Sequence, residues 1–592
     1  AETPYLYDLS IFNDDEIIYE KVGIREVSTS EGIFKINDQH IKLKGVNRHE
    51  TNPNTGMTIT LKDIYQDLSL MKKIGINAIR TSHYPNVMEF YQMCDYMGFY
   101  VLDEADLETH GAATYTGTYS LKTWQDFANR KENEEAVYER EVSLFEGDKN
   151  RTSVIIFSLG NEASWGNMFN KGLNYLKDNS DRPIHYEGVW NSLNKEDYYD
   201  KRLDFASRMY PSVDDIIQNH LNNERETRPI ILCEYSHAMG NSNGDLLDYW
   251  QLFNKSPRFA GAFVWEWCDH AINVNGRLCY GGDTNNLPND GNFCVDGLVT
   301  PYRKFKSNTR ELMAIYHDKL KEDRRIDKTK EFVHPISDKK VNYIVGQDGN
   351  LFDVLLNGEK VFEDGVWLNF LRADIDNDMH ERRLSYNKIN EAKRVIDKIE
   401  RNNDTVAFKC SLVYGEVKLL SYKIIYQAID NCLSISLSYE IFDDNLLVPR
   451  VGIKFKLLDH PQQFTFFGYG PLESYIDKHI HNEMGEFTLN VRDNMANNLK
   501  PQECGDHYYV SYLKLSNLEI SADKPFSMNV LPYSLETLRN TKHDYDLPVS
   551  NAVYVYLDIN LAGVGTNSCG PRLDRKYWIK NKDKNTFKIF FK

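Results

Sequence analysis

The sequence has no excess of basic charge and no apolar run long enough to cross a membrane. It contains 70 Lys and Arg against 87 Asp and Glu, so its formal net charge is −17. Nucleic acids and anionic membranes both require a basic surface, and we therefore expect neither as a partner. The first residues, AETPYLYDLSIF, contain neither a basic segment nor a long apolar segment, and they predict no signal peptide.

Cysteine is scarce and unpatterned. The 9 cysteines are scattered, odd in number and partly placed inside apolar segments, and none forms a Cys-x-x-Cys pair. This usage is typical of reduced thiols that act as small hydrophobic residues, and it offers no sign of a cysteine zinc site. We therefore predict a cytoplasmic protein.

The length is too great for one hydrophobic core. A chain of 592 residues is expected to hold roughly two to four domains. Its 41% hydrophobic and 27% charged residues are ordinary for a globular protein. No internal repeat is found.

Between residues 40 and 322, short apolar segments alternate with segments of helical periodicity. This pattern predicts a parallel sheet closed into a (β/α)₈ TIM barrel, whose active site lies at the carboxyl ends of its strands. The predicted strands are 41–47, 76–82, 99–103, 153–159, 183–187, 204–209, 229–233 and 261–267, and the clearest helices are 61–74, 86–97, 132–146 and 242–254.

The segments on either side of the predicted barrel have a different character. Residues 1–39 contain extended pieces too few to close a domain, which indicates the C-terminal part of a β-sandwich. Residues 323–339 are charged and lack periodicity, as a linker does. Residues 340–592 alternate with the period of β-strands and predict a large antiparallel β-sandwich. The fold class is therefore multidomain, α/β plus all-β.

Two apolar strands of the barrel end in a glutamate. Glu162 follows the apolar run in SVIIFSLGNEASWG, and Glu234 follows the apolar run in RPIILCEYSHAMGNS. An ionised Glu is costly to bury without a partner, so each one alone is equally well interpreted as a salt-bridged residue at a strand end. Polar residues at nearly every other strand end favour a functional site instead.

Two carboxylates at one rim suggest glycoside hydrolysis, which needs one protonated and one ionised carboxyl group. Trp265 is suited to stack on a sugar ring. Metal-dependent hydrolysis is the rival interpretation, because Glu108, His110 and Glu162 form a plausible divalent-ion cluster. The sequence ETH lacks the helical His spacing of zinc hydrolases, and carboxylate-rich ligation favours Mg²⁺.

Several motifs make a family resemblance explicit. LKGVNRHE, RTSHYPN, DEADLETHG, SVIIFSLGNE, RMYP, ILCEYSHAMGNS and GAFVWEW closely resemble the large bacterial β-galactosidases of glycoside hydrolase family 2, in register over about residues 20–322. A weaker resemblance continues through FLRADIDND, FGYGPLESY and KPQECGDHYY to that family's C-terminal domain.

The resemblance implies a role for each matched residue. Glu162 matches the acid/base and Glu234 the nucleophile of a retaining double displacement on terminal non-reducing β-D-galactosides. The implied sugar ligands are His49, His83, Asn161, Tyr210, His237 and Trp265. The implied cation ligands are Glu108, His110 and Glu162 for Mg²⁺, and Phe293 and Asp296 for Na⁺ or K⁺, with Asp296 in place of the Asn expected from the family.

The sequence also departs from the family pattern. The family's N-terminal jelly-roll domain is not matched, and residues 1–39 would be only the end of its immunoglobulin-like sandwich. We therefore expect either a homo-oligomer or a partnership with a separate N-terminal chain. Three hypotheses stay open: a β-galactosidase, a family 2 β-glucuronidase or β-mannosidase, and a truncated subunit that is inactive alone. The segment FGYGPLESY argues against the second.

Overall fold

The computed structural model describes residues 2–285, 287–318, 325, 340–402, 404–429 and 432–591. These residues form two units. The first comprises residues 1–238 and 246–305, and the second comprises residues 239–245 and 306–592. The predicted linker, 323–339, lies outside the described residues apart from Arg325.

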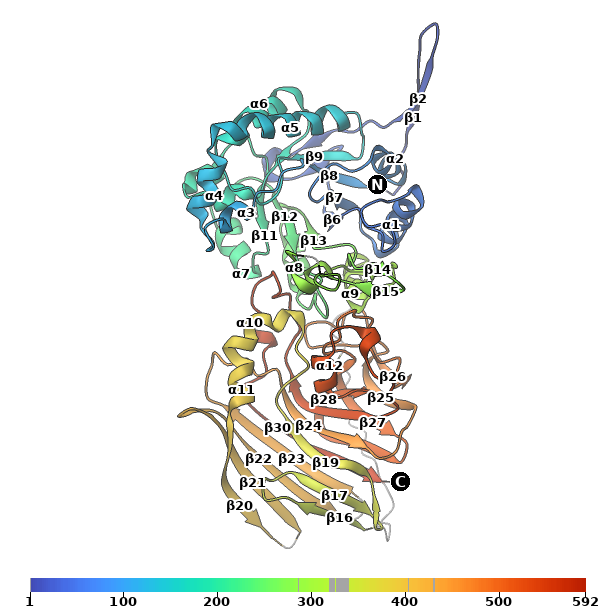
Figure 1. The fold of residues 1–592 in the computed structure, drawn as a ribbon, viewed down its shortest axis with the longest axis vertical. Coiled ribbons are helices and arrows are strands. Elements are labelled where there is room, and N and C mark those ends of the chain that lie inside the picture. Colours follow the sequence, from blue (N-terminus) through green and yellow to red (C-terminus); the bar gives the residue numbers. More distant parts are fainter. Residues whose placement is uncertain are drawn as a thin grey trace. The chain divides into compact units, whose positions relative to one another are not determined.

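The first unit contains the predicted barrel (Figure 1). Eight strands pair in parallel in the order β10-β9-β8-β7-β6-β13-β12-β11. Between the two end strands, the Asp204 amide donates to the Ile184 carbonyl (3.0 Å), and His185 Nε2 lies 2.7 Å from Ser207 Oγ. The strands are β6 (Leu43–Asn47), β7 (Ala78–Arg80), β8 (Tyr100–Glu104), β9 (Val154–Ser158), β10 (Ile184–His185), β11 (Ala206–Met209), β12 (Ile230–Tyr235) and β13 (Phe259–Val264).

Local sequence signals explain the helices between these strands. In α1 (Leu61–Ile74), Thr60 and Asp63 form a capping box, and Gly75 ends the helix in a left-handed conformation with φ of 94°. The inner face of α1 buries residues spaced by three and four positions, as an amphipathic helix requires. The other helices of eight or more residues in this unit are α2 (Met88–Met97), α4 (Leu121–Ala128), α5 (Glu134–Asp148), α6 (Asn170–Asn179) and α8 (Leu246–Lys255).

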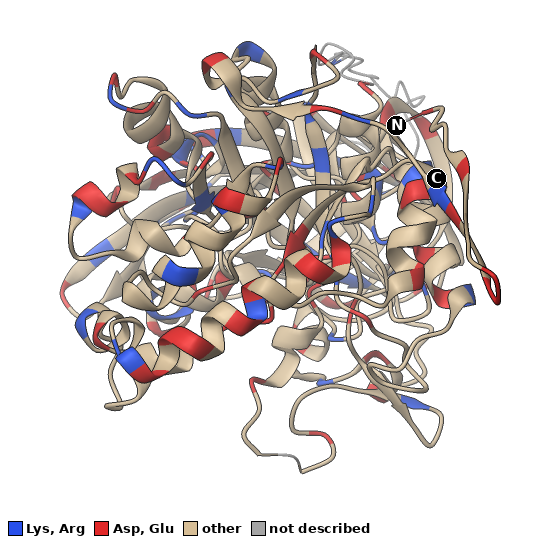
Figure 2. Ribbon diagram, turned by 90° about the horizontal axis from the view of Figure 1, so that it is seen from above, with Lys and Arg blue, Asp and Glu red and all other residues tan. Residues whose placement is uncertain are grey.

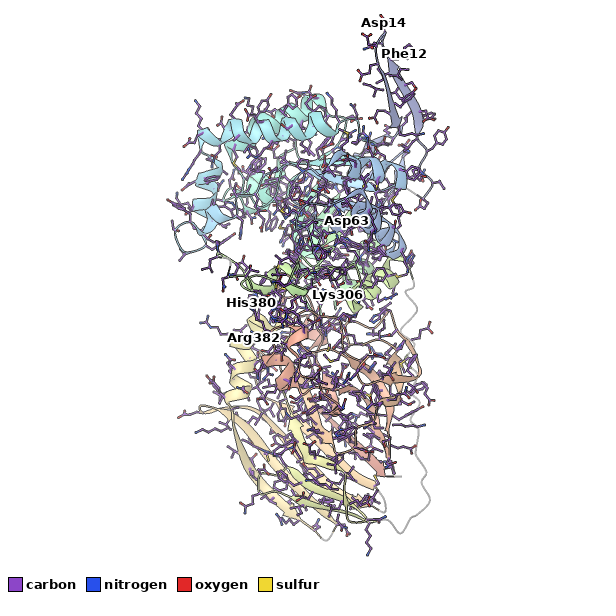
Figure 3. All side chains as sticks on the ribbon, turned by 45° about the vertical axis from the view of Figure 1, so that its right-hand side comes forward. Phe12, Asp14, Asp63, Lys306, His380 and Arg382 are labelled. Atoms are coloured by element: carbon purple, nitrogen blue, oxygen red, sulfur yellow. The ribbon has the colours of Figure 1, made fainter. Side chains whose placement is uncertain are left out.

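The N-terminal segment contains strands, as expected, and its assignment to the end of an immunoglobulin-like sandwich stays a prediction. Strands β1 (Tyr7–Phe12) and β2 (Ile17–Val22) pair only with each other, as a hairpin that projects from the first unit with Phe12 and Asp14 at its tip (Figures 1 and 3). Residues 27–40 form a small three-stranded sheet, β3-β4-β5.

That small sheet belongs with the barrel because its apolar side chains pack there. Phe34 and Ile36 are buried in one cluster with Leu43, Ala78 and Phe263 of the barrel strands. Leu43 and Ala78 are the first residues of β6 and β7, so the small sheet covers the amino end of the barrel. The carboxyl ends of the strands remain available for a site.

The second unit confirms the predicted large antiparallel β structure. Its strands pair antiparallel throughout a 15-stranded sheet that encloses one large apolar cluster. The strands are β16 (Val341–Val345), β17 (Leu351–Leu356), β18 (Glu359–Lys360), β19 (Phe362–Asn369), β20 (Lys393–Arg401), β21 (Thr405–Tyr414), β22 (Val417–Ile429), β23 (Cys432–Ile441), β24 (Arg450–Leu457), β25 (Gln463–Gly470), β26 (Glu483–Asn490), β27 (Asp506–Leu515), β28 (Leu518–Leu531), β29 (Tyr554–Leu561) and β30 (Lys582–Phe591). Helix α9 (Ser307–Tyr316) also belongs to this unit.

The distribution of charged residues and the hydropathy of the helices are both as the composition predicts. Acidic and basic residues are interspersed along the helices and loops (Figure 2). No helix in the described part of the chain is both long enough and apolar enough to cross a membrane.

Candidate active site

Every barrel strand brings polar residues to its carboxyl end, as the alternation of strands and helices predicted. Asn47, Arg80 and Glu104 are the last residues of β6, β7 and β8, and Glu234 lies near the end of β12. Loops that follow the strands carry the rest of this rim: His49, His83, Asn161, Glu162, Glu187, Tyr210, Trp265 and Glu266. Strand direction alone therefore gathers residues far apart in the sequence.

Arg80 connects most of this rim. Its guanidinium is fully buried and donates to Glu234 Oε1 (2.7 Å), to both carboxylate oxygens of Glu104 (2.7 and 3.0 Å) and to Asn161 Oδ1 (2.8 Å). It also donates to Asn47 Oδ1 (3.0 Å). A buried guanidinium needs such partners, and its rigid fork holds the side chains from four strands or strand ends in one geometry.

Glu104 is the permanent counter-ion of Arg80. Burial alone would raise the pKa of Glu104, but the charges of Arg80 and His83 outweigh burial and hold this pKa at about 2. His83 Nδ1 lies 2.8 Å from Glu104 Oε1, which fixes the orientation of the imidazole. The ion pair of Arg80 and Glu104 thus adjoins the two predicted catalytic residues.

Glu162 has the properties of a general acid. Burial, followed by the negative charges of Glu234 and Glu108, raises the pKa of Glu162 to about 8. Its backbone amide donates to Glu187 Oε1 (2.9 Å), and its φ of 34° is unusual for a residue other than glycine. At neutral pH Glu162 therefore carries a proton.

Glu234 lies in a different environment. Its carboxylate accepts a charge-assisted hydrogen bond from Arg80, and His83 Nε2 lies 3.9 Å from the same oxygen. The Tyr210 amide donates to the Glu234 carbonyl (2.9 Å), so Tyr210 accompanies the strand that carries Glu234. The two predicted catalytic carboxyl groups thus differ in charge environment, as a proton donor and a nucleophile must.

An aromatic wall adjoins the carboxylates. The Trp265 indole stacks on the His83 ring, with centroids 5.2 Å apart and planes inclined by 12°. His49 meets both rings edge-on, each at 5.5 Å. Trp265 Nε1 donates to Asp296 Oδ2 (2.9 Å), and His237 Nε2 lies 3.6 Å from the same oxygen.

The predicted magnesium ligands are only partly gathered. Glu108 lies near enough to Glu162 to raise its pKa, and Glu108 Oε2 accepts from Asn161 Nδ2 (2.6 Å). The ring of His110 packs edge-on to Trp124 at 5.3 Å. Within the described residues, the one group of three ionisable ligands whose atoms lie within 4.8 Å of one another is a different set, namely His49, Glu266 and His270.

The predicted monovalent-cation ligands lie close to the aromatic wall. Phe293 is part of a short turn of 3₁₀ helix, Gly291–Cys294, and its ring lies 6.1 Å from that of His237. Asp296 is buried, and burial together with the charge of Glu266 raises the pKa of Asp296 well above its usual value. Phe293 and Asp296 line one pocket with Trp265.

Sequence reasoning missed Arg80, Glu266 and His270 as site residues. A single Arg in the strand segment AIRTS is easily interpreted as solvent-facing, whereas its burial follows only from the closed sheet. Glu266 directly follows Trp265 at the end of β13, so the strand-end rule that located the other residues also points to Glu266. His270 lies four residues farther on, and nothing in the sequence identifies it.

Comparisons with known proteins cover both units of the chain. The family model described as "Glycosyl hydrolases family 2, TIM barrel domain" matches residues 27–319, and the model described as "Beta galactosidase small chain" matches residues 337–591. The β-galactosidase of Actinobacillus pleuropneumoniae is 33% identical, over 100% of this chain and 72% of that protein. The β-galactosidase of Staphylococcus xylosus is 31% identical, over 98% of this chain and 71% of that protein.

Among solved structures, a β-glucuronidase of Ruminococcus gnavus matches 53% of this chain and 57% of its own, with 20% identity and a TM-score of 0.44. The family models and the whole-chain relatives decide the classification. Because a relative more than 30% identical is matched along the entire chain, this protein belongs to glycoside hydrolase family 2 and is a glycosidase.

Proposed function

We propose that this chain is a retaining β-galactosidase, which cleaves terminal non-reducing β-D-galactosides through a glycosyl-enzyme intermediate. The observation that carries the proposal is the contrast between two carboxyl groups at the barrel rim. Glu162 has a pKa of about 8, whereas Glu234 is bonded to the buried cation Arg80. The whole-chain similarity to proteins named β-galactosidase supports the choice of sugar.

In the first step, Glu234 attacks the anomeric carbon while Glu162 transfers its proton to the departing glycosidic oxygen. The anomeric carbon–oxygen bond to the aglycone breaks as the bond to the Glu234 oxygen forms. Glu162 is left ionised. It then removes a proton from water, whose oxygen attacks the anomeric carbon and releases Glu234, so two inversions give net retention.

Arg80 has a positioning role in this scheme. Its charge lies 2.7 Å from the Glu234 oxygen, and Glu104 holds it from the other side. Asn161, hydrogen-bonded to both Arg80 and Glu108, would contact a sugar hydroxyl beside Glu162. The stacked Trp265 and His83 form an apolar and hydrogen-bonding wall for the ring.

A Mg²⁺ ion at Glu108 and Glu162 is part of the proposal. Negative charges lie close together here, because the charges of Glu234 and Glu108 both raise the pKa of Glu162. Carboxylate oxygens are also the ligands that Mg²⁺ prefers. The two carboxylates are the kind of donor that such an ion takes, and His110 would complete the predicted set. When bound, the cation supplies positive charge that favours the ionised form of Glu162.

The remaining elements of the proposal concern cell location and partners. Seven of the nine cysteines are free thiols, most of them buried, which supports a reducing compartment such as the cytoplasm: Cys94, Cys233, Cys268, Cys279, Cys294, Cys410 and Cys504. The exposed hairpin β1–β2 carries Phe12 and Tyr19 with 76% and 75% of their surfaces open, which supports association with a separate N-terminal chain or with a second copy.

A substrate panel tests the sugar specificity. The chain is assayed on 4-nitrophenyl β-galactoside, β-glucuronide and β-mannoside, with Glu234→Gln as the blank. We expect turnover of the galactoside alone and none by the variant. Faster turnover of the glucuronide or mannoside would replace the proposed sugar while leaving the two-carboxylate mechanism in place, whereas turnover that survives in Glu234→Gln would remove the mechanism.

A further inference from the structure

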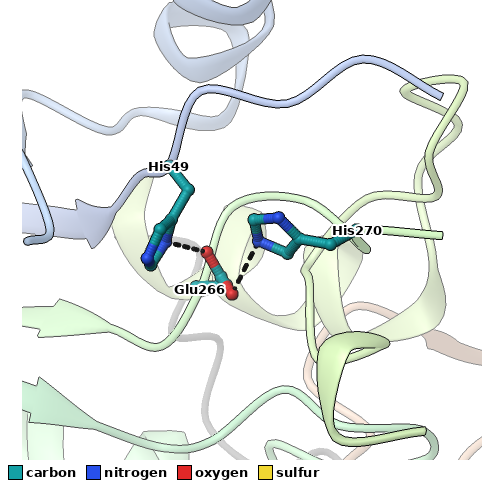
Figure 4. Close-up of side chains that lie close together, drawn as sticks. All are labelled: His49, Glu266 and His270. Atoms are coloured by element: carbon teal, nitrogen blue, oxygen red, sulfur yellow. Dashed lines mark hydrogen bonds and ion pairs between the residues drawn. The ribbon is translucent and has the colours of Figure 1, made fainter. Parts of the chain in front are cut away.

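Two histidines and one glutamate converge at the edge of the candidate active site (Figure 4). His49 follows strand β6, and Glu266 and His270 follow the neighbouring strand β13. His49 Nδ1 lies 2.9 Å from Glu266 Oε2, and His270 Nε2 lies 2.9 Å from Glu266 Oε1. All three ligand atoms lie within 4.8 Å of one another.

Each imidazole contacts a different oxygen of the same carboxylate. His49 and Glu266 meet with the geometry of a hydrogen bond. His270 Nε2 is buried and forms an ion pair with Glu266 Oε1 (2.9 Å). A divalent cation can take the place of the protons in these contacts, because the same ring nitrogens and carboxylate oxygens are metal-ligand atoms.

The donor set defines the kind of partner. Two imidazoles and one carboxylate are typical ligands of Zn²⁺ and of similar transition-metal ions, whereas Mg²⁺ and Ca²⁺ prefer oxygen donors. We propose that His49, Glu266 and His270 bind a divalent transition-metal ion of the Zn²⁺ class. The site shares no ligand with the predicted Mg²⁺ set of Glu108, His110 and Glu162, nor with Phe293 and Asp296.

The surroundings of the three ligands suit such an ion. Glu266 is nearly fully buried, with 2% of its surface exposed, and burial strengthens the attraction between its charge and a cation. The ligands line a pocket of about 540 Å³, which gives an ion a route from solvent. Two thiols, those of Cys279 and Cys294, line the same pocket and add soft donors to its wall.

Occupation of the site would act on sugar binding through His49. An imidazole can bind a metal through Nδ1 and keep Nε2 for a second partner. His49 lies edge-on to Trp265 and His83, the predicted sugar-binding wall. The metal would therefore fix the orientation of a predicted sugar ligand. This consequence rests on the proposed function, but the binding of the metal does not.

Direct metal binding tests the proposal. The chain is stripped of metal, returned to buffer with excess Mg²⁺ and K⁺, and titrated with Zn²⁺ in a calorimeter and with Co²⁺ in a spectrophotometer. We expect one Zn²⁺ per chain and Co²⁺ absorption bands that Zn²⁺ abolishes. The variant His270→Asn should weaken binding by roughly 100-fold or more, because even an outer partner of a metal ligand is worth about 10- to 100-fold.

Three further variants make the test specific. Glu266→Gln should lose binding as His270→Asn does, and it serves as the second variant if His270→Asn does not fold. His110→Asn, in the predicted Mg²⁺ set, and His380→Asn, on the exposed surface of the second unit, should bind Zn²⁺ as tightly as the unaltered chain. Equal binding by His270→Asn and the unaltered chain, or loss of binding in His110→Asn, would overturn the proposal.

Metal binding and catalysis are measured in separate experiments. If the site is occupied, Zn²⁺ should change KM for 4-nitrophenyl β-galactoside in the unaltered chain and in His380→Asn, and should leave KM unchanged in His270→Asn. A chain that binds Zn²⁺ as expected but cleaves no galactoside would retain the metal site and remove the proposed function. A chain that cleaves galactosides without binding Zn²⁺ would remove the metal site and retain the proposed function.

Discussion

The pKa of Glu162 should set the alkaline limit of activity. As the proposed acid, Glu162 can donate a proton only while it is protonated, and its pKa is about 8 instead of the usual 4.5. This difference corresponds to roughly 5 kcal/mol of extra free energy for ionisation, at about 1.4 kcal/mol for each pH unit. In the absence of Mg²⁺, kcat/KM for a substrate with a poor leaving group should therefore fall tenfold for each pH unit above about 8.

The leaving group and two variants isolate this effect. Lactose, whose leaving group needs a proton, should show the full alkaline decline, whereas 4-nitrophenyl β-galactoside should show a weaker one. Glu162→Gln should remove the decline, because no ionisable acid remains. Glu108→Gln should move it to lower pH by less than the whole difference, since burial is the largest cause of the raised pKa and is unchanged.

The assay is a series of kcat/KM values on lactose and on the aryl galactoside from pH 6 to pH 10, after exhaustive chelation. The same alkaline decline in Glu162→Gln would show that another group carries the proton. A shift to higher pH in Glu108→Gln would show that Glu108 does not repel the charge of Glu162. The first result refutes the assignment of Glu162 as the general acid, and the second refutes the contribution of Glu108 to its raised pKa.

Three further predictions follow from the same contacts. The raised pKa of Glu162 contributes stability that is complete below about pH 4.5 and is lost as the pH rises toward about 8, because Glu162 ionises at lower pH in the unfolded chain. Glu162→Gln should therefore unfold at a higher temperature than the unaltered chain at pH 8, but not at pH 4. Arg80→Met should lower the free energy of unfolding by about 3–5 kcal/mol, since Glu104 and Glu234 lose their buried partner, and urea denaturation showing a change below about 1 kcal/mol would contradict the role of Arg80. Restoring Mg²⁺ to the chelated chain should move the alkaline decline to lower pH, because a cation beside Glu162 favours its ionised form, and an unmoved decline would remove the magnesium proposal.

The barrel could be predicted from the sequence because its signals are local. Each strand is a short apolar run, and the predicted runs overlap all eight observed strands of the sheet. Strand direction then placed Glu162 and Glu234 at one end of the barrel without any further information. The large antiparallel sheet of the second unit followed in the same way from a period of two residues.

The N-terminal segment shows where local signals were insufficient. Extended sequence predicted strands at residues 1–39 but not their partners. Phe34 and Ile36 pack against the amino end of the barrel, a contact that depends on the closed sheet. The hairpin β1–β2 is a second separate element, and its strands were predicted only as pieces of a larger sandwich.

Residues that act through long-range contacts were also missed. Arg80 bonds to Glu234, 154 positions away in the sequence, and no sequence spacing encodes that contact. His49 and Glu266 are 217 positions apart, so the cluster they form with His270 appears only in three dimensions. The family resemblance assigned sugar contacts to His49 and Trp265 but gave no indication of Glu266 or His270.

Covalent trapping tests the central claim most directly. The chain is incubated with a 2-deoxy-2-fluoro-β-galactoside that carries a good leaving group, and the labelled peptide is identified by mass spectrometry. The account predicts one fluorogalactosyl group per chain, on Glu234, and none on the Glu234→Gln variant. A label on Glu162 or on any other residue, or turnover of galactosides with inversion at the anomeric carbon, would contradict the assignment of Glu234 as the nucleophile.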